Sequence, residues 1–250
     1  MRIAALYDIH GNLPAMEAAL HACRQEGTSA VVIGGDIAAG PLPAQTLDIV
    51  MALGKWAVPI QGPADRALVE AYDLRMAGKV KQLAAFDPVV AWAAGRITGS
   101  HRDFLASLPE SVLLHADELG EILFCRSLPG DSVRDVALDT PQEGIEGMLE
   151  GVAARVVVLA GAHAAFERVV GGRRIVSPGS VGMPCGQEPG AAWALFGPEV
   201  GLRRTDYDLA RAARRIVRSG MPGARALVRE RVLSVPLQPG EPDFSRFARQ

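Results

Sequence analysis

Two residues near the start of the chain, Asp8 and His10, place a carboxylate and an imidazole directly after an apolar run. The run covers residues 2–7 and contains neither Pro nor Gly, which predicts a short buried strand. Ligands of open α/β sheets bind just beyond the carboxyl ends of such strands. A carboxylate beside an imidazole suits a divalent ion of the Mn, Fe, Co, Ni or Zn kind. Asp-x-His alone is also a common loop with a hydrogen-bonded histidine, so the remaining ligands must come from elsewhere in the chain.

A second carboxylate, Asp36, is expected at the same sheet edge. The spacing of apolar residues predicts a helix from Leu13 to about Gly27, and a buried strand over 31–33 follows and ends in Gly34-Gly35-Asp36. A β-α-β unit of this kind makes a right-handed crossover, which brings the ends of both strands together. A third strand over 56–60 delivers another polar loop to this edge.

The remaining pattern predicts two or three covering helices over 66–108, several further strands and a late helix opened by Asp206 or Asp208. The further strands are expected at 111–115, 121–125, 156–160, 166–170, 173–176, 191–196 and 200–205. The strands in the first half of the chain are expected to be parallel and those in the later half antiparallel. We therefore expect two separate sheets, one of each kind.

Composition excludes several classes of protein. The 250 residues are 49% apolar with a net charge of −2, which predicts a globular protein and gives no signal for nucleic-acid binding or a polybasic membrane patch. Three widely spaced cysteines, without a CxxC pair, fit a reducing compartment. We expect a cytoplasmic protein without a signal peptide or membrane span, with homo-oligomerisation left open.

Together these segments resemble the calcineurin-like metallophosphoesterases, in particular their compact prokaryotic phosphodiesterase branch. The resemblance covers nearly the whole chain and implies an α/β fold: a two-sheet β-sandwich flanked by helices on both sides, in four αββα layers. It also implies one domain over 1–250, with 206–250 as a C-terminal helix and tail. The segments that carry it are 8–14, 34–36, 62–68, 177–182 and 207–208.

The family binds two metal ions at the sheet edge. By resemblance, the first ion would take Asp8, His10 and the bridging Asp36, which is three of its four protein ligands. The second ion keeps only the shared Asp36. The family's other ligands, and a histidine that helps the leaving group, are replaced here by Pro63, Ala64, Arg126, Ala162 and Ala164.

These replacements predict at most one divalent ion, with a metal-free site as the alternative. Three protein ligands with open positions are typical of catalytic zinc and non-haem iron sites. His163 is a further candidate ligand if its loop shifts by one residue, and otherwise a histidine that is packed or faces solvent. Alternatively, Asp8, His10 and Asp36 could form a hydrogen-bonded cluster that holds the geometry of the loops.

Arg126 and Asn12 are candidate phosphate-binding residues. A guanidinium at the position of a lost metal ligand could grip a phosphate, or pair with Asp8 or Asp36 and close the pocket. Asn12 could touch substrate or cap the first helix.

Two functions follow from this pattern. The first is an atypical one-metal hydrolase of phosphate esters, a phosphodiesterase or phosphatase. The second is a catalytically inactive pseudoenzyme of the same fold that binds a small phosphate-containing ligand or a protein partner. A nucleotide-dependent dehydrogenase is disfavoured because no G-x-G-x-x-G follows the first strand.

Overall fold

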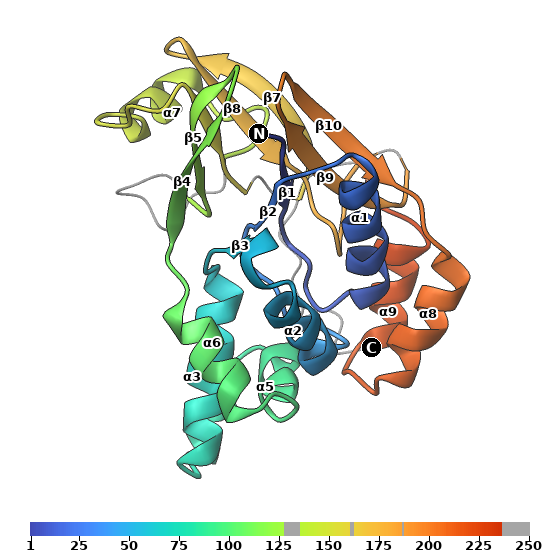
Figure 1. Cartoon of the computed structure of the whole chain (residues 1–250). Coiled ribbons are helices and arrows are strands. Elements are labelled where there is room, and N and C mark those ends of the chain that lie inside the picture. Colours follow the sequence, from blue (N-terminus) through green and yellow to red (C-terminus); the bar gives the residue numbers. More distant parts are fainter. Residues whose placement is uncertain (128–135, 161–162, 187, 237–250) are drawn as a thin grey trace.

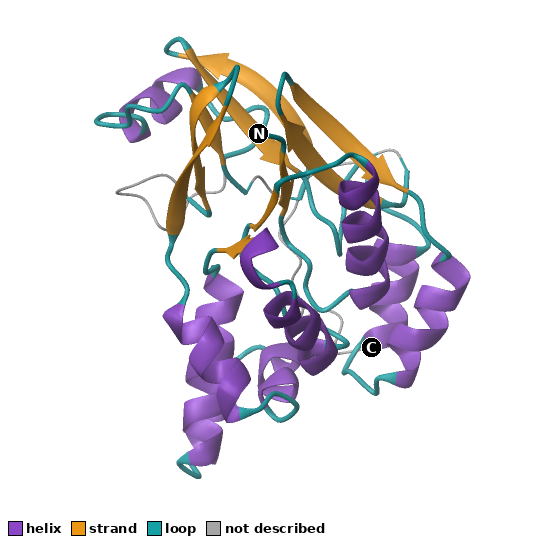
Figure 2. Ribbon diagram, in the orientation of Figure 1, coloured by secondary structure: helices purple, strands orange, loops and turns teal. Residues whose placement is uncertain are grey.

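The computed structural model describes residues 1–127, 136–160, 163–186 and 188–236, and its strands form two five-stranded sheets packed face to face (Figures 1 and 2). The first sheet has the order β10-β9-β1-β2-β3, with bounds β1 (Ile3–Leu6), β2 (Ala30–Ile33), β3 (Ala57–Pro59), β9 (Ala191–Phe196) and β10 (Val200–Thr205). The second has the order β4-β5-β6-β8-β7, with bounds β4 (Ser111–Ala116), β5 (Gly120–Cys125), β6 (Val156–Val158), β7 (Ala165–Val170) and β8 (Arg173–Pro178).

Each sheet is mixed, so the expectation of one parallel and one antiparallel sheet is wrong. In the first sheet β1, β2 and β3 are parallel, but β9 and β10 from the far end of the chain add to it in antiparallel fashion. In the second, β6 is parallel to both β5 and β8. The free edge of β1 is completed by the largely buried β9, a pairing between distant segments that local periodicity does not encode.

Helices cover the outer faces of both sheets, which confirms the predicted four-layer sandwich. Four of them, α3 to α6, occupy the stretch over 63–107, one more than the two or three expected. Asp208 rather than Asp206 caps α8, because its side chain accepts the backbone N–H of Arg211 at 2.8 Å. The helices are α1 (Leu13–Gln25), α2 (Pro43–Ala52), α3 (Pro63–Met76), α4 (Val80–Leu83), α5 (Pro88–Ala94), α6 (Gly99–Ser107), α7 (Gln142–Met148), α8 (Leu209–Arg218) and α9 (Ala224–Leu227), with short turns η1 (Gly54–Trp56) and η2 (Val228–Val232).

The alternation of side chains along β1 divides the core into layers. Ile3 and Ala5 face the second sheet, whereas Ala4 and Leu6 face the helices that cover the first. Between the sheets, Phe124 and Phe196 meet edge to face with ring centroids 5.4 Å apart. On the other side of the sandwich, α7 packs on the second sheet (Figure 1). The strand ends of β1 and β2 are thereby fixed between rigid layers.

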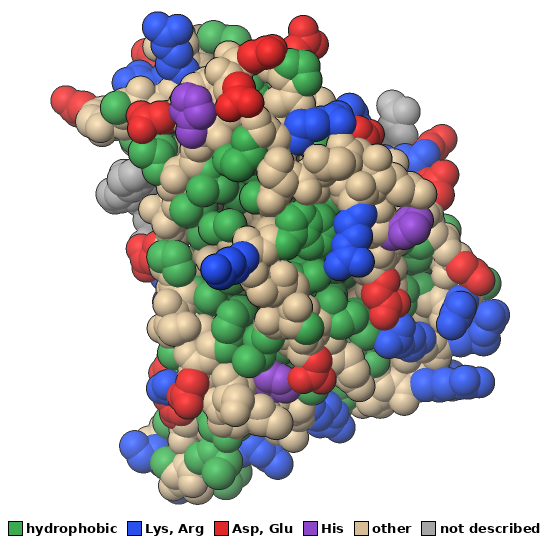
Figure 3. Space-filling view, viewed as in Figure 1, with side chains coloured by type: hydrophobic (Ala, Val, Ile, Leu, Met, Phe, Trp, Pro, Cys, Tyr) green, Lys and Arg blue, Asp and Glu red, His purple; other side chains and the backbone are tan. Residues whose placement is uncertain are grey.

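Charged side chains are spread over the surface (Figure 3), and the last described residues contact the body of the protein. Acidic and basic side chains are interspersed around apolar ones on the face shown in Figure 3. Within the described part of the chain, no helix has the length and apolar character needed to cross a membrane. The segment after η2 returns to the body of the protein, since the carbonyl of Pro236 accepts the backbone N–H of Gly186 at 3.0 Å. The predicted tail beyond it, residues 237–250, lies outside the described residues.

Candidate metal and phosphate site

The backbone is strained at one place in the described structure. Four residues other than glycine have a positive φ there: Asp8 (54°), His10 (45°), Asp36 (52°) and His163 (63°). Side chains with a Cβ rarely adopt this left-handed conformation, and each instance costs on the order of 1–3 kcal/mol. All four residues lie in loops at the same edge of the sandwich. The surrounding structure therefore holds these particular side chains in place against a local preference for other backbone conformations.

Hydrogen bonds between loops hold the strained segment after β1. The N–H of His10 donates to the carbonyl of Asp36 at 2.9 Å, and the carbonyl of Asp8 accepts bonds from the Ser180 hydroxyl (2.8 Å) and the Gly182 N–H (3.0 Å). Gly40 packs so closely that a Cβ there would lie 1.8 Å from the carbonyl oxygen of His10. Loops from both sheets thus fix the position of Asp8 and His10.

Asp65 is a buried carboxylate that supports the loop carrying Asp36. Its two oxygens accept the backbone N–H groups of Asp36 (2.8 Å), Ile37 (2.9 Å) and Gly62 (2.9 Å). Burial, and after it the charge of Asp36, raise the pKa of Asp65 to about 7, while the three donors oppose the rise. Our sequence argument gave Asp65 no role. The sequence feature that could have identified this role is that Asp65 is a carboxylate in the first turn of the helix after the third strand.

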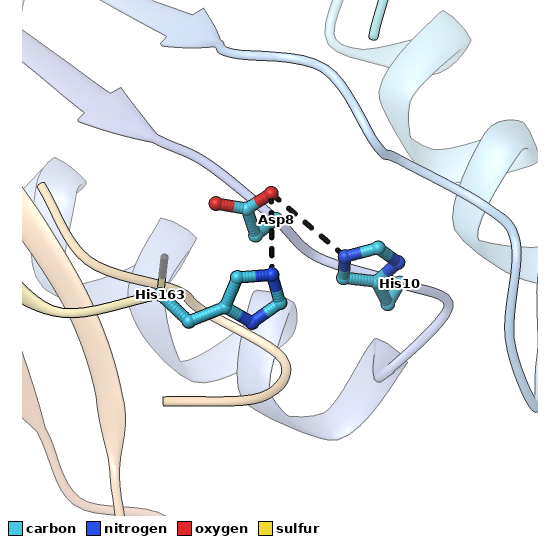
Figure 4. Close-up of side chains that lie close together, drawn as sticks. All are labelled: Asp8, His10 and His163. Carbon is cyan, nitrogen blue, oxygen red and sulfur yellow. Dashed lines mark ion pairs between the residues drawn. The ribbon is translucent and has the colours of Figure 1, made fainter. Parts of the chain in front are cut away.

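Asp8, His10 and His163 converge on one point (Figure 4). The Nε2 atoms of both histidines lie 3.8 Å from the same oxygen, Oδ1 of Asp8. The two imidazole rings stack with centroids 5.3 Å apart. The three potential ligand atoms lie within 4.8 Å of one another, and all three side chains are buried. The structure therefore groups His163 with the first two predicted ligands.

The two imidazoles are suited to bind a metal through Nε2. His163 has its Nδ1 2.9 Å from the carbonyl of Met183, which favours a proton on Nδ1 and leaves the Nε2 lone pair toward Asp8. Burial, and after it the neighbouring His163, lower the pKa of His10 to about 3, so its ring is neutral at physiological pH. Oδ2 of Asp8 is buried and has no hydrogen-bond partner among the described residues. A carboxylate and two imidazoles of this kind fit one divalent ion.

Arg126 lies against both carboxylates. Its Nη1 donates to Oδ1 of Asp8, and its Nη2 lies 2.8 Å from Oδ2 of Asp36. The other oxygen of Asp36 accepts the backbone N–H of Ala64 at 2.8 Å. Both oxygens of Asp36 are thus engaged, and Asp36 stands outside the convergent group of Asp8, His10 and His163. Of the two alternatives for Arg126, the structure shows the ion pair with Asp8 and Asp36.

The positions expected to hold a second ion offer no side-chain donor. Pro63 and Ala64 form the first turn of α3, and Ala164 makes a β-bridge with Cys185. Ala162 lies outside the described residues. The guanidinium of Arg126 supplies positive charge next to Asp36, where a bridging carboxylate would otherwise face a second ion. Among the described residues, the donor atoms that could hold a metal ion therefore form one group, that of Asp8, His10 and His163.

Asn12 has a structural role in this conformation. Its Oδ1 accepts the backbone N–H of Ala15 at 3.4 Å, which caps α1. Its Nδ2 donates to the carbonyl of Gly182 at 2.8 Å and to the hydroxyl of Tyr207 at 3.4 Å. The amide links α1 to the segment before β9 and to Tyr207, the residue before the N-cap of α8.

Solved structures define the class of fold. The hypothetical protein PH1004 from Pyrococcus horikoshii OT3 matches with a TM-score of 0.76 and 21% identity over 94% of this chain and 99% of that one. A metallophosphoesterase from Sphaerobacter thermophilus matches with a TM-score of 0.70 and 22% identity over 91% and 97%. A putative diadenosine tetraphosphatase matches with a TM-score of 0.55 and 18% identity over 82% and 94%.

These matches confirm, at the level of the fold, the resemblance to calcineurin-like metallophosphoesterases. The chain has the metallophosphoesterase fold, and similarity of this degree establishes fold rather than activity. No family model matches the sequence, and no curated protein matches it either. Any assignment of activity must therefore come from the site.

Proposed function

We propose that the protein is a one-metal hydrolase of phosphate esters, acting as a phosphodiesterase or phosphatase. The observation that carries this proposal is the convergence of Asp8, His10 and His163 on one point, with the cationic Arg126 beside them. Asp8, His10 and His163 would hold the ion. When bound, a divalent ion would supply positive charge to a phosphate oxygen and lower the pKa of a nearby water.

The chain's own residues would then orient and neutralise the phosphate. The guanidinium of Arg126 carries several N–H donors in one plane and binds phosphate oxygens in pairs. Because its Nη2 lies 2.8 Å from Oδ2 of Asp36, the guanidinium is held beside the site through that nitrogen. Asp65 in turn holds the backbone of Asp36. Negative charge that develops on a phosphate during hydrolysis would therefore meet a cation that is already in place.

Metal content and turnover test this proposal together. Protein purified without chelator should contain one Mn, Fe, Co, Ni or Zn ion per chain and should hydrolyse bis(p-nitrophenyl) phosphate in added Mn²⁺. We expect Asp8→Asn to contain no bound metal and to hydrolyse this substrate at least 100-fold more slowly. A rate that survives Asp8→Asn would place the chemistry elsewhere and would contradict the proposal.

One observation favours a second candidate, a pseudoenzyme that binds a phosphate-containing ligand without turnover. Asp8, His10, His163 and Asp36 are each at most 5% exposed, and Arg126 pairs with both carboxylates. The guanidinium therefore offsets part of the charge of the two buried carboxylates without any metal. One outcome of the same experiment identifies this function: phosphate binding by calorimetry, with no hydrolysis above the Asp8→Asn control.

A further inference from the structure

One oxygen atom in the site has two competing uses. Oδ1 of Asp8 receives the Nη1 donor of Arg126, and the Nε2 atoms of His10 and His163 face the same oxygen at 3.8 Å. A metal ion held by these two imidazoles and the Asp8 carboxylate would bring two cations, the ion and the guanidinium, onto the same carboxylate. Two cations in contact with one carboxylate repel each other strongly in a buried site. A divalent ion and the Arg126 contact with Asp8 therefore disfavour each other.

We propose that Arg126 is a built-in competitor of the metal ion, and that metal binding releases its Nη1 donor from Asp8 for a phosphate group. This inference rests on the proposed one-metal phosphate site and adds a coupling between its two ligands. In the metal-free state the guanidinium pairs with both Asp8 and Asp36 and offsets part of their negative charge. In the metal-bound state the guanidinium would keep its contact with Asp36, and its Nη1 would donate to an oxyanion instead of to Asp8.

The attachment of Arg126 allows this exchange. Its two terminal nitrogens are bound to different carboxylates, and the Nη2 contact with Asp36 at 2.8 Å can persist when Nη1 leaves Asp8. Asp36 is well fixed, because its Oδ1 accepts the Ala64 N–H and its own N–H donates to Asp65. The contact with Asp36 can thus stay in place while Nη1 moves away from Asp8.

The side chain of Arg126 is less buried than those of Asp8, His10 and His163. The side chain of Arg126 is 13% exposed, against 1% for Asp8, 3% for His10 and 5% for His163. Arg126 is thus the most accessible group of the cluster.

Reciprocal coupling between metal and phosphate follows. If metal binding frees the Nη1 donor, phosphate must raise the affinity for metal by the same factor by which metal raises the affinity for phosphate. The competition also makes the metal affinity of the wild-type protein lower than that of a variant without the guanidinium. Both effects are properties of equilibrium binding and need no turnover.

Calorimetric titration of the metal-free protein with Mn²⁺, with and without 10 mM inorganic phosphate at roughly physiological ionic strength, tests the coupling. We expect phosphate to lower the Kd for Mn²⁺ at least fivefold in the wild type. Arg126→Met should lower the Kd for Mn²⁺ at least tenfold when phosphate is absent. In this variant, phosphate should change the Kd for Mn²⁺ less than twofold. Arg66→Met, which removes the same charge from an exposed ion pair with Glu110, should change neither value more than twofold.

A measurement on wild-type protein keeps the test decisive if Arg126→Met does not fold. The guanidinium resonances of Arg126 in ¹⁵N-labelled protein should show hindered Nη rotation without metal, and Zn²⁺ should relieve the hindrance of Nη1. Unchanged Arg126 resonances on saturation with Zn²⁺, or a phosphate effect on metal affinity that persists fully in Arg126→Met, would overturn the inference. Absence of Mn²⁺ binding to both wild type and Arg126→Met would also overturn it.

These results are separable from those for the hydrolase. Coupling without hydrolysis would support the competition and reject the proposed activity. Hydrolysis that depends on Asp8, with no change in metal affinity in Arg126→Met, would support the activity and reject the competition.

Discussion

The imidazole rings of His10 and His163 stack with centroids 5.3 Å apart, and both direct Nε2 toward Oδ1 of Asp8. His10 lies in the loop after β1, in the first sheet, whereas His163 precedes β7, in the second. The donor group for a metal ion is thus assembled across the interface between the two sheets. Its properties lead to four predictions.

His163→Ala should weaken metal binding at least tenfold. The change removes one of three convergent ligand atoms while Asp8 and His10 remain. The Kd for Mn²⁺ from calorimetry measures the effect, and His21→Ala on the exposed face of α1 is the matched control. Equal affinities of the two variants would show that His163 is only a packed histidine.

Acid should destabilise the metal-free protein through His10. Its folded-state pKa of about 3 lies below the ordinary histidine pKa of 6.5, so the unfolded chain binds the proton more tightly. The stability that neutral His10 contributes is complete above pH 6.5 and is lost as pH falls toward 3, by up to about 1.4 kcal/mol per pH unit. Urea unfolding in EDTA from pH 8 to 4.5 should show this loss in the wild type relative to His10→Gln. A pH-independent difference between the two proteins would contradict the prediction.

Asp65→Ala should destabilise the fold by at least about 3 kcal/mol. The change leaves three buried backbone N–H groups, those of Asp36, Ile37 and Gly62, without their acceptor, at a cost of roughly 1–3 kcal/mol each. The free energy of unfolding in urea measures the loss. Asp103→Ala, at a side chain that is 77% exposed, should change stability by less than about 1 kcal/mol. Similar values for both variants would refute the proposed support of the Asp36 loop.

Gly40→Ala should be among the most damaging single-methyl additions. A Cβ at Gly40 would lie 1.8 Å from the His10 carbonyl oxygen, so the loop that carries His10 must shift or the chain must unfold. We expect a loss of about 3 kcal/mol or more in thermal or urea unfolding. Gly144→Ala in α7, where no atom lies within 4 Å of the added carbon, should instead gain about 0.5–1 kcal/mol. A tolerated Gly40→Ala would mean that the loops can separate easily.

The sequence by itself determined the elements and the edge at which Asp8, His10 and Asp36 lie. Short apolar runs followed by polar loops are local features, and the right-handed β-α-β crossover turns their order into a position in space. By the resemblance, side chains that lack a donor atom, such as Pro63 and Ala64, stand at ligand positions of a second ion, which led us to expect at most one. The four-layer sandwich followed from the resemblance that these motifs carry.

Only the tertiary structure decided how the far segments complete the site. The pairing of β9 with β1, the direction of the His163 ring and the choice of Arg126 between solvent, phosphate and two carboxylates depend on how the two sheets pack. The structure likewise gave Asp65 its three backbone partners. Such contacts join residues far apart in the chain, and their free energy depends on burial and charge in the folded state. Local sequence patterns carry no information about either quantity.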